Sequence, residues 1–264
     1  MDLKELCNQV AHISKEVGSY LIGERENFEA DRIEEKSFNN LVSYVDKTAE
    51  QQFMRKLKLL LPEAGFIAEE SEDLQPNEEL NWVIDPLDGT TNFIFKLPFY
   101  CTSVALLKNN ELLVGVIYDP THDELFTAYK DGGAYLNGKR IEVSSRSSLK
   151  ESLLATGFPY DDFEFDAEYL ALLSALMKKS KGIRRIGSAA LDLAYVACGR
   201  FDAFYEYGLN SYDVAAGALI VKEAGGSVND FKGEDNFIFG EEILASNTMI
   251  HSETLEEIGR FFKS

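Results

Sequence analysis

The stretch WVIDPLDGTTN, residues 82–92, is the most informative part of the chain. Its apolar start predicts a buried strand, and this strand runs directly into Asp85 and Asp88. Pro86 fixes one backbone angle and Gly89 allows a sharp turn, so both carboxylates can converge on one point at the end of the strand. A turn closed by Asx-type hydrogen bonds is the alternative for the DPLDG residues taken alone.

The residues around the two aspartates add oxygen atoms and an anion-binding element. The carbonyl group of Leu87 lies between them in sequence and could supply a third oxygen. Thr90, Thr91 and Asn92 predict the start of a short helix, whose first N–H groups would face an anion. The whole stretch therefore favours a metal and phosphate site.

Further acids stand at the ends of other predicted elements. Glu69 and Glu70 follow an apolar strand, Asp213 precedes an apolar helix, and Asp46 opens another helix. Each has an ordinary alternative: solvated charge for the glutamates, an N-cap for Asp213 and a favourable helix dipole for Asp46. Taken together, acids at the ends of separate elements and a phosphate-binding turn are what a phosphatase with several magnesium ions requires.

Length and composition indicate one globule. The 264 residues are 45% hydrophobic and 27% charged, which is ordinary for a soluble protein. No apolar run of about 18 residues predicts a membrane span, and the N-terminus lacks the features of a secretory signal, so a cytoplasmic location is expected. No linker separates the halves, and we expect a single domain, 1–264, with an α+β lobe over about 1–148 and an α/β lobe over about 149–264.

The scattered cysteines and histidines argue against a zinc site. They are Cys7, Cys101, Cys198, His12, His122 and His251. The cysteines are expected to be buried, reduced thiols, and a bound metal would have mostly carboxylate ligands, which points to magnesium, manganese or calcium.

The net charge of −19 argues against nucleic acid or an anionic membrane as a partner. The same charge would repel a phosphorylated substrate over most of the surface. Bound divalent cations could reverse the sign locally.

The first half of the chain predicts two helices followed by an antiparallel meander. The first helix starts after Asp2, with Gly23 as a plausible stop, and a polar loop or weakly ordered arm follows over 24–40. A second helix is expected over 46–61 and ends at Pro62. The predicted strands are 66–68, 81–84, 101–107, 112–118, 124–129 and 140–143. Asn137-Gly138 is a strong hairpin signal before the last of them.

The second half predicts alternating strands and helices. The expected strands are 153–156, 183–186, 203–205 and 243–245, and the expected helices are 167–179, 189–199, 214–224 and 253–262. An α/β half joined to an α+β half follows.

With these motifs in order, the sequence resembles the inositol monophosphatase family of the magnesium-dependent, lithium-sensitive phosphatase superfamily. The motifs that carry the resemblance are LVSYVD at 41–46, FIAEES at 66–71, WVIDPLDGTTNF at 82–93, TGFPY at 156–160, GSAALD at 187–192 and YDVAAG at 212–217. The last has Tyr212 where the family commonly has Trp. The resemblance covers nearly the whole chain.

The resemblance implies a layered α/β/α/β/α sugar-phosphatase fold, two or three Mg²⁺ ions, and a homodimer that hydrolyses a small phosphorylated polyol. The first ion would be held by Glu69, Asp85 and the Leu87 carbonyl, and the second by Asp85, Asp88 and Asp213. Glu69 would also approach a third, weaker ion.

The remaining roles follow from the same resemblance. Asp46 and Thr90 would orient or deprotonate the attacking water, and the N–H groups of Gly89 and Thr90 would bind phosphate. Asp88, Ala189 and Glu206 would contact substrate hydroxyls. Activated water would attack phosphorus in line without a covalent enzyme intermediate.

Two departures and several alternatives bear on the substrate. Asn210 and Phe95 stand where the family often has His, near the rim of the expected site. Sister phosphatases that act on a 3′,5′-bisphosphate nucleotide, fructose 1,6-bisphosphate or histidinol phosphate share the metal motifs, although the TNF sequence after DGT favours the monophosphatase branch. A non-catalytic ion-binding or scaffold protein of the same fold would be expected to lack one of the acids, and an acidic structural domain is a further alternative.

Overall fold

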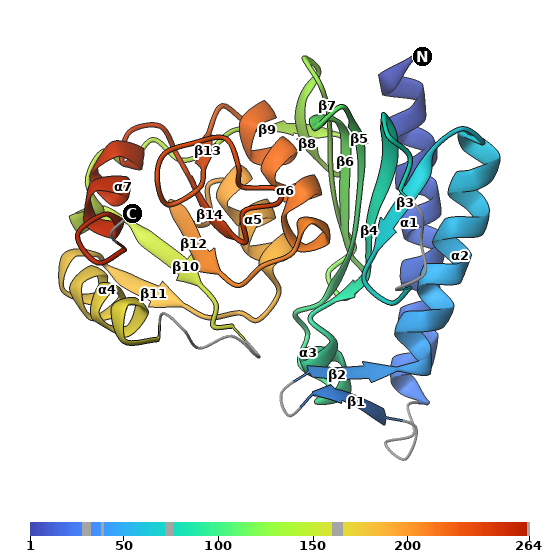
Figure 1. Cartoon of the computed structure of the whole chain (residues 1–264), viewed down its shortest axis with the longest axis horizontal. Helices are drawn as coiled ribbons and strands as arrows, with labels where there is room; N and C mark the ends of the chain where they lie inside the picture. Colours follow the sequence, from blue (N-terminus) through green and yellow to red (C-terminus); the bar gives the residue numbers. More distant parts are fainter. Residues whose placement is uncertain (28–32, 38–39, 72–75, 160–165, 263–264) are drawn as a thin grey trace.

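The computed structural model describes residues 1–27, 33–37, 40–71, 76–159 and 166–262. Two β-sheets stand side by side with helices between them and on their outer faces (Figure 1). This is the layered α/β/α/β/α architecture expected from the sequence.

The larger sheet has seven strands, β3 to β9, and their order in the sheet is the same as their order in the sequence. The strands are β3 (Gly65–Ala68), β4 (Leu80–Asp88), β5 (Cys101–Lys108), β6 (Glu111–Asp119), β7 (Glu124–Tyr129), β8 (Gly133–Leu136) and β9 (Lys139–Ile141). Only β3 and β4 pair in parallel, and all other neighbours are antiparallel. Strands β5 to β9 pair antiparallel in sequence order, which confirms the predicted meander. Short turns can join such strands because the strands run in opposite directions.

The smaller sheet has five strands in the order β11-β10-β12-β14-β13. They are β10 (Leu153–Thr156), β11 (Gly182–Arg184), β12 (Ala203–Tyr207), β13 (Ser227–Asn229) and β14 (Glu242–Ser246). β10 runs parallel to both of its neighbours, whereas β14 runs antiparallel to β12 and β13.

Helices α1 (Leu3–Glu26) and α2 (Tyr44–Leu60) cover the outer face of the seven-stranded sheet (Figure 1). Their apolar faces pack with one face of β4, which contributes Trp82 and Leu87 to the same core. Asp2 begins α1, since its carboxylate accepts hydrogen bonds from the N–H groups of Lys4 and Glu5.

Helices α5 (Ala189–Ala197) and α6 (Ser211–Glu223) lie between the two sheets. Both are apolar nearly all round, as expected for helices enclosed on every side. α4 (Asp166–Lys179) and α7 (His251–Ile258) cover the outer face of the smaller sheet (Figure 1). Two short helices, α3 (Thr90–Ile94) and the 3₁₀ helix η2 (Leu149–Glu151), complete the described helices.

Two expectations about the region after α1 are wrong. Gly23 does not stop the helix, which continues to Glu26 because Asn27 caps it and its side-chain amide donates to the Gly23 carbonyl at 3.0 Å. The polar segment 24–40 is also not simply a loop. Within it, β1 (Ile33–Ser37) pairs antiparallel with β2 (Asn40–Ser43), and the rest of the segment, residues 28–32 and 38–39, lies outside the described residues.

Smaller differences concern element ends and one thiol. β13 has only three residues, too few for a periodic signal, and no strand was predicted there. The expected strand 140–143 lies at Lys139–Ile141 instead. The three cysteines are free, as expected, but Cys198 is only half-buried. No helix among the described residues is long and apolar enough to cross a bilayer. The division into one domain with two lobes stays a prediction.

Candidate active site and metal centre

A bulge in β4 places Asp85 and Asp88 on the same face of the sheet. Side chains of a regular strand alternate, so two residues three apart would point to opposite faces. Asp85 pairs with Ser103 and Asp88 pairs with Cys101, so three steps along β4 match two steps along β5. The extra residue of the bulge restores the common face.

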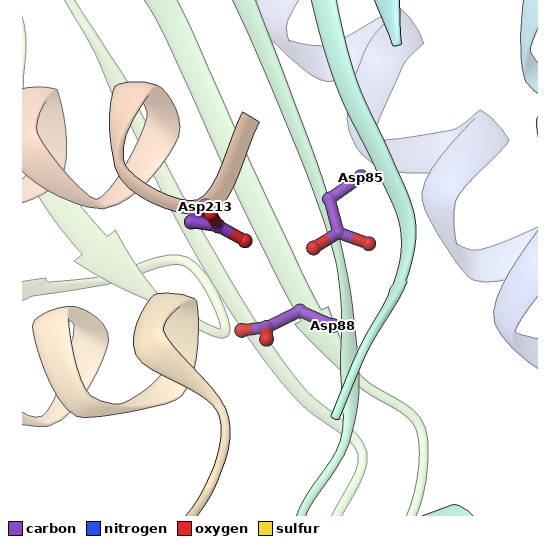
Figure 2. Close-up of side chains that lie close together, drawn as sticks. All are labelled: Asp85, Asp88 and Asp213. Atoms are coloured by element: carbon purple, nitrogen blue, oxygen red, sulfur yellow. The ribbon is translucent and has the colours of Figure 1, made fainter. Parts of the chain in front are cut away.

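Asp213 completes a group of three carboxylates, which Figure 2 shows facing one another. It lies in the first turn of α6, whereas Asp85 and Asp88 come from β4. One oxygen atom from each of the three carboxylates lies within 4.8 Å of the others. Asn210, and not Asp213, is the N-cap of α6, and the N–H group of Asn210 donates to Asp213 Oδ2 at 2.7 Å.

Burial raises the pKa values of all three carboxylates, and neighbouring negative charges raise two of them further. Burial raises the pKa of Asp85 well above its ordinary value, and the negative charges of Glu69, Asp88 and Asp213 raise it further. Burial likewise raises the pKa of Asp88 to about 6 and that of Asp213 to about 7, with the charge of Asp88 adding to the latter. Such clustering of like charges is costly unless a cation lies among them.

Asp88 is held in place by the start of α5. Its Oδ2 atom accepts hydrogen bonds from the Ser188 hydroxyl at 2.6 Å and from the Ala190 N–H group at 2.7 Å. These two bonds engage one oxygen of the carboxylate. One carboxylate oxygen of Asp88 lies within 4.8 Å of carboxylate oxygens of Asp85 and Asp213.

Thr90 connects the turn after β4 to a buried acid on α2. Its hydroxyl lies 2.9 Å from Asp46 Oδ1 and 3.0 Å from the carbonyl oxygen of Leu87. Asp46 is fully buried. A threonine hydroxyl has one proton, so when it donates to Asp46 its lone pairs can accept a hydrogen bond from another group.

Gly89 allows this turn because its φ is +93°, a left-handed conformation that other residues rarely adopt. A Cβ atom there would lie 2.7 Å from the Phe99 carbonyl oxygen. α3 begins at the next residue, as predicted, and the first N–H groups of a helix have no partner within it.

Glu50 holds the segment that carries Glu69. Its side chain is buried and accepts hydrogen bonds from the N–H group of Glu70, at 2.8 Å, and from the hydroxyl of Ser71. Sequence reasoning assigned Glu50 no role. Its spacing of four residues from Asp46 places both acids on the same face of α2, but this spacing alone does not reveal the contact with Glu70.

The acids surround a cavity of about 120 Å³ that continues to the start of α5 and the end of β12. Its wall includes nearly all the site residues expected from the sequence, namely Glu69, Asp85, Leu87, Asp88, Gly89, Thr90, Ala189, Glu206 and Asp213. Asp46 is outside the cavity wall, behind Thr90. Asn210 also lines the cavity, whereas Phe95 does not and is 68% exposed.

Three further charged residues, Arg185, Asp192 and Glu206, also line this cavity. Burial raises the pKa of Glu206 to about 8, although the positive charge of Arg185 opposes the rise. Asp192 has its pKa raised well above the ordinary value, by burial first and then by Glu206 and Asp88. Arg185 and Asp192 were given no role from sequence, although Asp192 ends the GSAALD motif.

The donor atoms suit a hard divalent cation. All the converging side chains are carboxylates, and Leu87 adds a carbonyl, so oxygen is the available ligand type. The raised pKa values of Asp85 and Asp213 are what bound positive charge would reverse. The residues present therefore fit magnesium.

Comparison with known proteins gives consistent matches along the chain. The model of the inositol monophosphatase family matches residues 2–261. The Nus factor SuhB of Pseudomonas aeruginosa is 40% identical over 261 residues, which cover 97% of this chain and 96% of that protein.

Two solved structures extend the match to three dimensions. The extragenic suppressor protein SuhB from Bartonella henselae is 37% identical with a TM-score of 0.91, covering 98% of this chain and 100% of that one. An inositol monophosphatase from Anabaena (Nostoc) is 36% identical with a TM-score of 0.89, covering 99% and 98%. Sequence, fold and site thus agree, and the chain belongs to the inositol monophosphatase family.

Proposed function

We propose that this protein is a magnesium-dependent phosphomonoesterase that releases phosphate from inositol monophosphate or a similar polyol phosphate. The observation that carries the proposal is the convergence of Asp85, Asp88 and Asp213 within 4.8 Å of one another. Thr90 lines the same cavity, and its hydroxyl group is hydrogen-bonded to the buried Asp46. Membership of the family supports the same reaction.

The chain's own residues would divide the work between holding the ions and positioning the ester. Glu69, Asp85 and the Leu87 carbonyl would hold a first magnesium ion, and Asp85, Asp88 and Asp213 a second. Glu69 would also lie near a third, weaker ion. Magnesium in this place would acidify a bound water and neutralise charge on the phosphoryl oxygens.

Thr90 and Asp46 would handle the proton of the attacking water. Asp46 Oδ1 accepts a hydrogen bond from the Thr90 hydroxyl at 2.9 Å, which would leave the Thr90 lone pairs to accept a hydrogen bond from the water. The N–H groups of Gly89 and Thr90, at the start of α3, would bind phosphoryl oxygens. Asp88, Ala189 and Glu206 would contact the hydroxyl groups of the alcohol.

The test is phosphate release with Mg²⁺ from inositol 1-phosphate, glycerol 2-phosphate, fructose 1,6-bisphosphate, histidinol phosphate and a 3′,5′-bisphosphate nucleotide. The expected result is the highest kcat/KM for inositol 1-phosphate, loss of activity with EDTA but not with a thiol reagent, and inhibition by lithium. Preference for fructose 1,6-bisphosphate, histidinol phosphate or the 3′,5′-bisphosphate nucleotide would replace the substrate while keeping the reaction. Absence of release from every ester would contradict the phosphatase.

Asp85→Asn is the matched variant for this assay. Asparagine keeps the size of the side chain and an oxygen that can accept the Leu87 N–H bond, now 2.9 Å, so the fold should be unchanged by circular dichroism. Because the charge expected to bridge both ions is lost, turnover should be abolished. Near-normal turnover would exclude Asp85 as a shared ligand.

A Nus-factor role is the second candidate, because the relative from Pseudomonas aeruginosa carries that name. Association with RNA polymerase would need a protein-binding surface rather than turnover. Capture of purified polymerase by both wild type and Asp85→Asn would support it, and absence of capture by either would contradict it. We further propose that the protein is a cytoplasmic homodimer, which size-exclusion chromatography with light scattering can check.

A further inference from the structure

Asp192 is a buried acid in the cavity wall that the proposed reaction does not use. It lies in the first turn of α5 and is 1% exposed. Its Oδ1 atom is buried and has no hydrogen-bond partner in the structure. A buried carboxyl oxygen without a partner lowers stability, so its presence calls for a reason beyond packing.

The metal centre does not supply that reason. Among the described residues, the group of three acids whose oxygen atoms lie within 4.8 Å of one another is Asp85, Asp88 and Asp213, and Asp192 does not belong to it. Asp192 lines the same cavity as Glu206 and Arg185. Burial raises its pKa, the charges of Glu206 and Asp88 raise it further, and the charge of Arg185 lowers it.

The carboxyl group of Glu206 lies close to the backbone of Gly157. A Cβ atom on residue 157 would lie 2.1 Å from each of the two carboxyl oxygens of Glu206. The carboxyl group therefore rests directly over the backbone of Gly157, where any larger residue would displace it. Two carboxyl groups from different elements, α5 and β12, thus line one compartment beside Asp88.

We infer that Asp192 is a specificity-determining residue that binds one hydroxyl group of the alcohol half of the ester, next to the hydroxyl group held by Glu206. The site would then select phosphate esters that carry neighbouring hydroxyl groups. This inference rests on the proposed phosphatase function. A substrate without the hydroxyl group leaves the buried carboxyl unpaired, and this is the physical basis of strong discrimination between analogues.

The experiment compares two esters that differ only in hydroxyl groups, glycerol 1-phosphate and propyl phosphate, with Mg²⁺ present. The measured quantity is the ratio of their kcat/KM values. In Asp192→Ala this ratio should fall about 10- to 100-fold, as expected when a buried hydroxyl group of the substrate loses its hydrogen-bond partner. Asp192→Asn, which keeps an oxygen acceptor of the same size, should retain more of the preference. Glu206→Ala should lower the ratio as well.

A thermal unfolding measurement separates specificity from a structural role. Because Oδ1 has no partner to lose, Asp192→Ala and Asp192→Asn should unfold at the wild-type temperature or above it. A clear drop in both, or an unchanged ratio of kcat/KM values, would overturn the inference while leaving the phosphatase in place. Absence of phosphate release by the wild type from either ester, and from inositol 1-phosphate, would instead refute the proposed function and the inference together.

Discussion

Replacing Asp213 by asparagine should make the metal-free protein more stable at high pH and remove its response to magnesium. The folded-state pKa of Asp213 is about 7, against an ordinary value of 3.8. Between those two pH values the folded protein binds more protons than the unfolded chain, so stability falls as pH rises. The penalty is absent at low pH and complete above about pH 7.

The magnitude follows from the same difference. For an isolated buried group, a pKa raised by about 3, at roughly 1.4 kcal/mol per pKa unit, would lower the free energy of unfolding by roughly 4 kcal/mol. Asp213 is half-buried, and part of its raised pKa comes from repulsion by Asp88. We therefore expect Asp213→Asn to raise the free energy of unfolding by about 1 to 2 kcal/mol at pH 8. For a chain of this size, that corresponds to a midpoint shift of about 2 to 8 °C.

The assay is thermal unfolding in EDTA at pH 4.5 and pH 8, followed by a magnesium titration at pH 8. Asp213→Asn should be only slightly more stable than the wild type at pH 4.5, which lies just above the ordinary pKa of 3.8, and clearly more stable at pH 8. Magnesium should stabilise the wild type, by about 2.7 kcal/mol at a hundred times its Kd, and the variant much less. Asp235→Asn, at an exposed position, is the control and should change neither quantity.

Two results would refute this reasoning. A metal-free Asp213→Asn protein less stable than the wild type at pH 8 would mean that the carboxylate supports the fold through its bond to Asn210. Equal stabilisation of both proteins by magnesium would mean that Asp213 is not a ligand.

The remaining predictions concern two residues that act beside the carboxylates. Thr90→Ala removes the hydroxyl group that is hydrogen-bonded to Asp46 and should lower kcat by about 100-fold or more. Thr90→Ser keeps a hydroxyl group and should keep most of the activity. Equal rates for the two variants would exclude the hydroxyl group from proton transfer. Glu50→Gln weakens the hydrogen bonds to Glu70 and Ser71 and should raise several-fold the magnesium concentration needed for half-maximal activity. The kcat at saturating magnesium should change less, and the circular dichroism spectrum should be unchanged. An unchanged magnesium requirement would show that Glu50 does not position this segment.

Local sequence signals were enough for most elements and for the ligand type. Alternating apolar residues and short turns such as Asn137-Gly138 predicted the meander of the larger sheet, because hairpin geometry depends on a few adjacent residues. Scattered histidines and cysteines beside clustered acids indicated oxygen ligands. Errors arose where a single contact decides, such as the Asn27 side chain bonded to the Gly23 carbonyl near the end of α1, and where a strand is too short for a periodic signal, such as β13.

The roles of Glu50 and Asp192 could not be inferred in this way. Each is one acid in an otherwise ordinary helix, and what distinguishes it is a contact or a missing contact in the folded chain. Glu50 bonds to a segment about twenty residues away, and Asp192 has an oxygen atom that finds no partner. Contacts between segments distant in sequence leave no periodic pattern.

The sequence alone therefore established a strand that ends in two aspartates, a turn that requires Gly89, and a helix start suited to an anion, because these depend on neighbouring residues. Tertiary structure decided that the two aspartates share a face and that Asp213 joins them. The first depends on the bulge between β4 and β5, and the second on the packing of α6 between two sheets. Strand register and helix packing are set by contacts across the whole chain, so they exist only once the chain has folded.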